Sequence, residues 1–254
     1  MDQKKRAELV EKILTLEKED ALEIAKLIID NYKADFRGNQ YIEEFLDIAS
    51  DYDRLGEPEK ALNIYKKAEK RALAIGDNDY LAPIYGGMGV SYNYLKEYES
   101  SVKFYQKAIK LFETSNNEQE IGIIYNNLGF VYKNILKFEE AVKSYIKAIE
   151  IFRKIDDKFS MTASYFNIAD IFKSLKDYET ALKYIDKCIE LDKELKLDSL
   201  NDDLGYKDDL LVRLGRKSKD LTKKDENVFL DDEDDETTND KSENKRWNWL
   251  WRKK

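Results

Sequence analysis

Residues 125–148 read YNNLGFVYKNILKFEEAVKSYIKA and carry small and aromatic residues at regular intervals. Intervals of three and four positions place residues on one face of an α-helix. The residues concerned are Gly129 and Tyr132, followed by Ala141, Tyr145 and Ala148. The stretch therefore predicts two helices joined by a turn, in which small and aromatic side chains of one helix pack against the other.

The same pattern recurs along the chain with a period of forty residues. The small position that opens the second helix is occupied by Ala21, Ala61, Ser101, Ala141 and Ala181. The aromatic position of the first helix is occupied by Tyr52, Tyr92, Tyr132 and Phe172. One such hairpin cannot bury its apolar face alone, whereas stacked neighbours can. The sequence therefore predicts an all-α chain, built as an α-solenoid of five helical hairpins.

These residues resemble the tetratricopeptide repeat family. Repeats of that family usually span about 34 residues. The forty-residue period is similar to that of a subgroup with longer helices, which includes kinesin light chains and bacterial peptide-receptor regulators. In the first copy Lys12 stands at the aromatic position, and the proline that usually closes a repeat is missing. The resemblance implies a right-handed superhelix of hairpins that binds a protein or peptide partner.

We expect the solenoid to occupy residues 1–216. Its repeats are predicted near 1–39, 40–78, 79–118, 119–158 and 159–197, followed by a capping helix at 198–216 with a polar outer face. Helices are predicted near 3–16, 19–36, 40–55, 58–75, 79–95, 98–115, 119–135, 138–155, 159–175 and 178–194. Residues 217–245 are acidic and poor in apolar residues, which predicts a disordered linker. Residues 246–254 form a basic, Trp-rich tail.

Composition excludes several classes of chemistry. The chain has no His and one Cys, Cys188, so a Ser-His-Asp triad, a His metal site and an intrachain disulfide are excluded. Cys188 occupies a small-residue position of the repeat, which predicts a core residue. The formal net charge of -8 argues against a nucleic-acid partner. We therefore expect a protein that is not an enzyme and has no cofactor or metal site.

The location that we predict is the cytoplasm, with a peripheral membrane contact as an alternative. Charges recur throughout residues 1–20, so no apolar secretory leader is present there. The longest uncharged stretches, 81–92 and 121–132, are too short to cross a bilayer.

The resemblance implies that the first helix of each hairpin lines a concave groove. The positions that would then face a peptide are Asn93, Tyr94, Asn126, Asn127, Phe130, Lys133, Asn134, Asn167, Asp170 and Lys173. An amide side chain both donates and accepts, so groove asparagines could pair with a peptide backbone. A solvated helix face is the alternative interpretation. A carboxylate clamp is not assigned, because the earlier repeats lack its Lys and Asn residues.

The run Gly86-Gly87-Met88-Gly89 is not a phosphate-binding loop, because the Lys of that motif is missing. Gly89 is the small residue of its repeat. Our hypothesis is that Gly86 and Gly87 open a pocket between Tyr94, Asn126 and Phe130.

The last ten residues hold all the tryptophans of the chain, Trp247, Trp249 and Trp251, together with five Lys and Arg residues. Three interpretations stay open: weak binding to a membrane surface, insertion into a protein groove, or no specific contact. The function predicted is a scaffold or adaptor that binds a partner in the groove. The alternatives are a membrane-peripheral adaptor tethered by the tail, and a regulator that its own tail inhibits.

Overall fold

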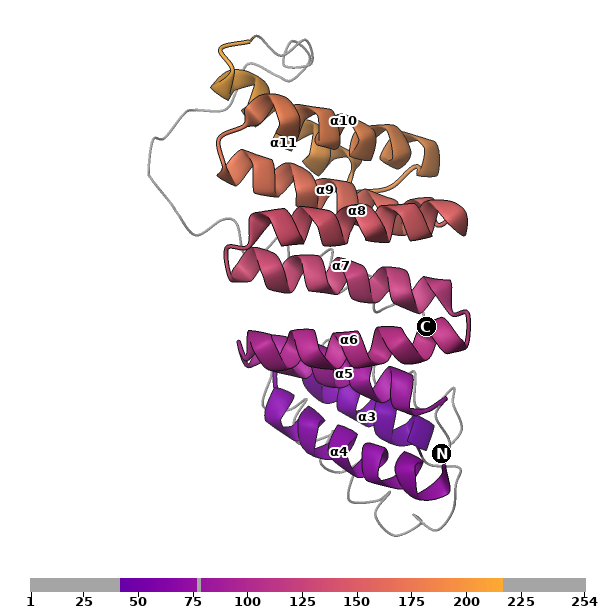
Figure 1. Cartoon of the computed structure of the whole chain (residues 1–254). Coiled ribbons are helices and arrows are strands. Elements are labelled where there is room, and N and C mark those ends of the chain that lie inside the picture. Colours follow the sequence, from indigo (N-terminus) through magenta and orange to yellow (C-terminus); the bar gives the residue numbers. More distant parts are fainter. Residues whose placement is uncertain (1–41, 77–78, 217–254) are drawn as a thin grey trace. The chain divides into compact units, whose positions relative to one another are not determined.

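The computed structural model describes residues 42–76 and 79–216, and every regular element in these ranges is an α-helix (Figure 1). The first predicted repeat, the acidic segment and the tail lie outside the described residues. The chain divides into two compact units, Met1–Asn117 and Glu118–Lys254.

The described part of unit 1 contains two helical hairpins. The first consists of α3 (Ile42–Arg54) and α4 (Pro58–Ile75), and the second of α5 (Leu81–Tyr94) and α6 (Tyr98–Thr114). Helix α5 packs against its partner α6 and also against α3 and α4. The hairpins therefore stack through the first helix of the later one, as the repeat pattern predicts.

Between Glu118 and residue 216, unit 2 contains two further hairpins and one single helix. The hairpins are α7 (Glu118–Asn134) with α8 (Phe138–Lys154), and α9 (Lys158–Ser174) with α10 (Tyr178–Leu195). Helix α11 (Leu200–Arg213) packs against α10. The helix bounds predicted from sequence for the described residues agree with these bounds to within three residues at each end.

Residues with a left-handed backbone conformation end the helices at a regular spacing. A positive φ recurs every twenty residues, at Gly56, Gly76, Lys96, Asn116, Leu136, Asp156, Lys176 and Lys196. At every one of these turns except that of Gly76, the next residue closes the turn with a backbone hydrogen bond, such as Lys137 N–H to the carbonyl of Tyr132 at 2.9 Å. This is the Schellman arrangement, which satisfies carbonyls at a helix end. It explains how each helix stops without a proline.

Small and aromatic residues pack together where the repeat pattern places them. A Cβ atom at Gly129 would lie 2.6 Å from a ring carbon of Tyr145, and one at Gly89 would lie 2.6 Å from Tyr105. Such distances are too short for a non-bonded contact, so the ring fills the space that a glycine leaves. The rings of Tyr105 and Tyr145 are almost fully buried. The predicted contact between the two helices of a hairpin is confirmed in both units.

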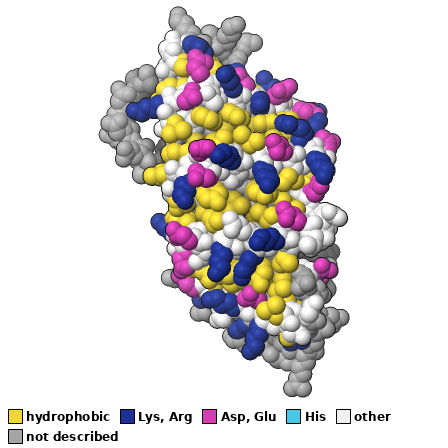
Figure 2. All heavy atoms as spheres, in the orientation of Figure 1, with side chains coloured by type: hydrophobic (Ala, Val, Ile, Leu, Met, Phe, Trp, Pro, Cys, Tyr) yellow, Lys and Arg dark blue, Asp and Glu magenta, His cyan; other side chains and the backbone are white. Residues whose placement is uncertain are grey.

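Charges of both signs are scattered over one face of the molecule. On the face drawn in Figure 2, Lys and Arg side chains alternate with Asp and Glu side chains, and apolar patches lie between them. Within residues 42–76 and 79–216, no helix combines the length and the apolar character that a bilayer crossing would require.

Candidate functional site

The residues predicted to face a peptide lie on the first helices of their hairpins. Asn93 and Tyr94 are in α5 of unit 1, and the other eight are in α7 and α9 of unit 2. Each group therefore belongs to its own compact unit.

The asparagines of unit 2 are divided between the interior and the surface. Asn126 is only 3% exposed, and its amide oxygen accepts a 3.0 Å hydrogen bond from the hydroxyl of Ser164. Asn167 is also buried, whereas Asn127 is half-buried and Asn134 is exposed. Asn126 therefore joins α7 to α9, and Asn127 and Asn134 present more of their amides to solvent.

Lys133 and Asp170 form an ion pair across the same two helices. The Nζ atom of Lys133 lies 2.5 Å from Oδ2 of Asp170, which is buried. The hydroxyl of Tyr206, in α11, donates to Oδ1 of the same carboxylate at 3.2 Å. Both oxygens of Asp170 are therefore engaged by groups of the chain itself.

Lys173 is held by α11 in the same way. Its Nζ atom lies 2.9 Å from Oδ2 of Asp209 and 4.2 Å from the centroid of the Tyr206 ring. That ring also packs against Phe166 of α9, with 5.1 Å between centroids. Helix α11 therefore covers part of the α9 face that was predicted to meet a peptide.

At the described positions of unit 1 that correspond to Lys133 and Lys173 stand Asp53 and Asn93. Asp53, on α3, is 6% exposed, and one of its carboxyl oxygens accepts a 2.9 Å hydrogen bond from the hydroxyl of Ser91. Burial raises the pKa of Asp53 to about 8, and the hydrogen bond from Ser91 opposes the rise. Next to Asn93 on α5, Tyr94 is 49% exposed.

The two glycines that were expected to open a pocket behave differently. A Cβ atom at Gly87 would lie 2.3 Å from Cζ of Tyr65, because the Tyr65 ring occupies that space. A Cβ atom at Gly86 would meet nothing within 4 Å. The hypothesis of a pocket at both glycines is therefore wrong for Gly87, which is required by packing. Gly86 does adjoin open space.

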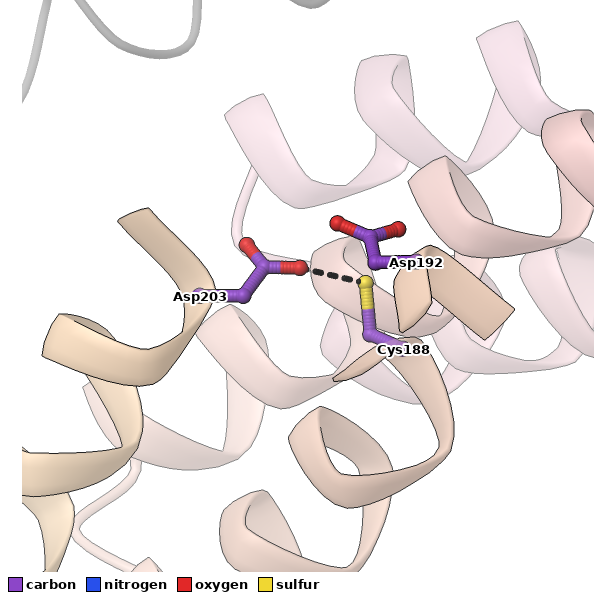
Figure 3. A group of neighbouring side chains, drawn as sticks. All are labelled: Cys188, Asp192 and Asp203. Carbon is purple, nitrogen blue, oxygen red and sulfur yellow. Dashed lines mark hydrogen bonds between the residues drawn. The ribbon is translucent and has the colours of Figure 1, made fainter. Parts of the chain in front are cut away.

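Cys188 lies in the core, as predicted, beside two buried carboxyl groups (Figure 3). Its thiol donates a 2.9 Å hydrogen bond to Oδ2 of Asp203, which joins α10 to α11. Three side chains here each offer one atom that could bind a metal ion: Cys188, Asp192 and Asp203. These three atoms lie within 4.8 Å of one another. The hydroxyl of Ser199 donates to Asp192. These hydrogen bonds account for the geometry, and we assign the group to the packing of α11.

A profile of the tetratricopeptide repeat matches residues 41–114 and 120–194. The chain belongs to the tetratricopeptide repeat family. No curated protein matches its sequence. Solenoids of such repeats serve as scaffolds for protein interaction, because stacked hairpins form an extended surface.

Solved structures share the fold of this tetratricopeptide repeat chain at low sequence identity. BtubC from P. vanneervenii is 21% identical with a TM-score of 0.61, over 82% of this chain and 81% of that one. Aspartyl phosphate phosphatase F from Bacillus subtilis is 18% identical with a TM-score of 0.71, over 80% of this chain and 53% of that one. TPR-like repeats of a Podosopora anserina kinesin light chain are 11% identical with a TM-score of 0.56, over 68% of this chain and 87% of that one. The chain thus spans about half the length of phosphatase F, and these likenesses concern the fold.

Sequence reasoning placed the residues of this tetratricopeptide repeat chain on the right helices but missed three partners. Ser164, Tyr206 and Asp209 were not predicted to contact the candidate residues, because each contact joins helices far apart in sequence. Asp53 was not chosen as a site residue either. The signal was available, since Asp53 is in phase with Asn93, Lys133 and Lys173. Trp247, Trp249 and Trp251 lie outside the described residues, so the tail contacts stay predictions.

Proposed function

We propose that this chain binds a peptide segment of a partner protein along the first helices of its hairpins. Membership of the tetratricopeptide repeat family supports binding, and we assign the chain no catalytic role. Its single buried thiol suits a reducing compartment, which is consistent with a cytoplasmic location.

The observation that carries the proposal is a partly exposed face of α5. Gly86 adjoins open space, and Asn93 lies seven residues further on, which is the same face of the helix. Tyr94 follows with a half-exposed ring, and a half-exposed aromatic residue is typical of binding surfaces. In unit 2, by contrast, Lys133 and Lys173 are engaged by Asp170 and Asp209. The α5 face is therefore where we place the main contact with a peptide.

The test is a selection of peptides from a random display library on the immobilised full chain, followed by affinity measurements. Gly86→Leu should fill the open space and weaken the selected peptide at least tenfold, with an unchanged circular dichroism spectrum. Gly205→Leu is the matched control, because Gly205 in α11 also has nothing within 4 Å of its Cβ position. We expect that variant to bind within twofold of the original chain. Equal affinities for the two variants, or no enriched peptide, would refute the proposal.

A further inference from the structure

In the described part of unit 1, the second helices of the hairpins are basic and the first helices are acidic. Helices α4 and α6 together carry eight Lys and Arg residues and four Glu residues, which gives a formal charge of +4. Helices α3 and α5 carry one Arg and five Asp and Glu residues, which gives -4. In a protein whose net charge is -8, the second helices of this unit therefore stand out as a basic surface.

Six lysines make up this surface, which we call the lysine face. Three lie along one side of α6 at intervals of four and three residues, and three occupy about one turn of α4. Dark-blue side chains are visible over α6 and α4 in the lower half of Figure 2. None of the six forms an ion pair within residues 42–76 and 79–216, whereas Lys60, at the start of α4, pairs with Glu57. The members are Lys66, Lys67, Lys70, Lys103, Lys107 and Lys110, of which Lys107 is half-buried and the others are exposed.

Aromatic rings hold one member of the lysine face in position. The Nζ atom of Lys107 lies 4.7 Å from the centroid of the Tyr85 ring and 4.8 Å from that of Phe104. Phe104 stacks on Tyr92, with 5.2 Å between the ring centroids. Burial, followed by a hydrogen bond with Glu69 of α4, raises the pKa of the Tyr85 hydroxyl. Tyr85 therefore contacts both second helices, and a cation–π contact orients Lys107 without neutralising its charge.

The second helices of unit 2 share the lysine over a ring but lack the excess of positive charge. The Nζ atom of Lys147 lies 4.5 Å from the centroid of the Tyr125 ring. Helices α8 and α10 together carry seven Lys and Arg residues and eight Asp and Glu residues. A carboxylate one helical turn from a lysine offsets its charge. At this spacing unit 1 has the pairs Lys67–Lys70 and Lys107–Lys110, and unit 2 has the pairs Lys147–Glu150 and Lys187–Glu190.

A short acidic peptide segment fits the lysine face better than a long polyanion does. Ionised Asp and Glu side chains offer acceptors, and each lysine offers three donors. The three lysines of α6 span about 10 Å along the helix, which about three to four extended residues would cover. A membrane surface or a nucleic acid would extend beyond the face and meet the negative charge that predominates in the rest of the chain.

We propose that the lysine face of α4 and α6 binds an acidic segment of a partner protein, in which several Asp or Glu residues lie close together. This surface is separate from the one used in the proposed function, because it is formed by second helices, whereas the peptide described above contacts the first helix α5. Unit 1 then offers two surfaces of different chemistry to its partners.

Anisotropy of a fluorescein-labelled decaglutamate peptide, titrated with the full chain, tests this inference. The double variant Lys107→Gln/Lys110→Gln should weaken the affinity about fivefold, because two exposed ion pairs are lost. The matched control is Lys147→Gln/Lys187→Gln, which changes the net charge equally and also removes lysines held over rings. We expect the control to bind within twofold of the original chain. Added salt should weaken binding to the original chain, because exposed ion pairs are screened.

A second variant separates the loss of charge from the loss of ring packing. Lys66→Gln/Lys70→Gln removes two exposed lysines of α4 and leaves Lys107 over its rings, so it should weaken the peptide about as much. Circular dichroism spectra should stay unchanged in all three double variants. Equal affinities of the α4 variant and the original chain would contradict the inference.

Three other results would overturn the inference. The first is an equal loss of affinity in the unit 1 variants and in the unit 2 control, because binding would then follow net charge. The second is binding of phosphatidylserine vesicles or of a single-stranded oligonucleotide through these lysines, with no binding of the peptide. The third is a loss of peptide affinity in Gly86→Leu, because it would place the acidic peptide on the first helices. An unchanged affinity in Gly86→Leu supports a separate surface, whatever the outcome of the library selection.

Discussion

The hydroxyl of Ser91 donates a 2.9 Å hydrogen bond to the carboxyl group of Asp53, although the two residues are 38 positions apart. This bond joins α5 to α3 at the place where the chain leaves a second carboxyl oxygen buried and without a donor among the described residues. The same carboxyl group therefore ties neighbouring repeats together through one oxygen and leaves the other oxygen buried.

Asp53 should make the stability of the protein fall as the pH rises. Its pKa is about 8 in the folded chain and 3.8 in a model peptide, so between these values the folded state holds a proton that the unfolded state has released. The free energy of unfolding then decreases by up to about 1.4 kcal/mol per pH unit. Asp53→Asn cannot titrate, so its stability relative to the original chain should increase between pH 5 and pH 8.

Urea unfolding at pH 5, 7 and 8.5 measures this difference. Tyr65 on α4 and Tyr94 on α5 feel the charge of Asp53, and Arg54 acts on both of them. Asp51 and Tyr105 also act on Tyr65, and the substitution changes none of these groups. Two stability profiles that run parallel over this pH range would show that Asp53 is ionised throughout.

The two adjacent glycines of α5 should respond to alanine in opposite directions. Gly87→Ala places a Cβ atom against the buried Tyr65 ring, so the free energy of unfolding should drop by about 1–3 kcal/mol. Gly86→Ala meets no atom and removes a flexible residue from a helix, so it should stabilise the chain by about 0.5–1 kcal/mol. Urea unfolding of the two variants side by side decides the matter, and changes of the same sign would contradict the packing described for Tyr65.

Leu136 stands in a left-handed turn that favours glycine. Its φ is +60° and its side chain is 73% exposed, so Leu136→Gly loses little burial and relieves an unfavourable backbone conformation. We expect the free energy of unfolding to rise by about 1 kcal/mol. Leu175 is the matched control, because it is 50% exposed and has a φ of -79°. Leu175→Gly should destabilise the chain by about 0.5–1 kcal/mol, and a thermal melt of each variant compares them.

The fold could be predicted because its main contacts repeat within each hairpin. Gly89 with Tyr105 and Gly129 with Tyr145 are sixteen residues apart, so a period in the sequence translates directly into a contact between neighbouring helices. Helix ends followed from the same period, since the turns recur at fixed positions.

The candidate site could be predicted only in part, because its contacts join different repeats. The spacing of Asn126 places it on the first helix of its hairpin. It does not reveal that the hydroxyl of Ser164 donates a hydrogen bond to the amide oxygen of Asn126. Helix α11 was expected only as a cap with a polar outer face, yet Tyr206 reaches Asp170 from 36 residues away, much as Asp170 reaches Lys133 from 37. Such pairs depend on how two helices are rotated against each other, which a single-helix pattern does not specify.

The even spacing of the left-handed turns limits how the length of this array can change through insertion or deletion of coding sequence. Turns recur every twenty residues, so losing or gaining twenty residues would leave every remaining helix with an intact end. It would also turn every downstream first helix into a second helix, and every second helix into a first one. Glycine and tyrosine positions such as Gly129 and Tyr145 would then no longer face each other within one hairpin. Only a change of forty residues preserves both the turns and the pairing of glycine with tyrosine. Gain or loss of whole hairpins is therefore the route by which such an array can lengthen or shorten and still fold.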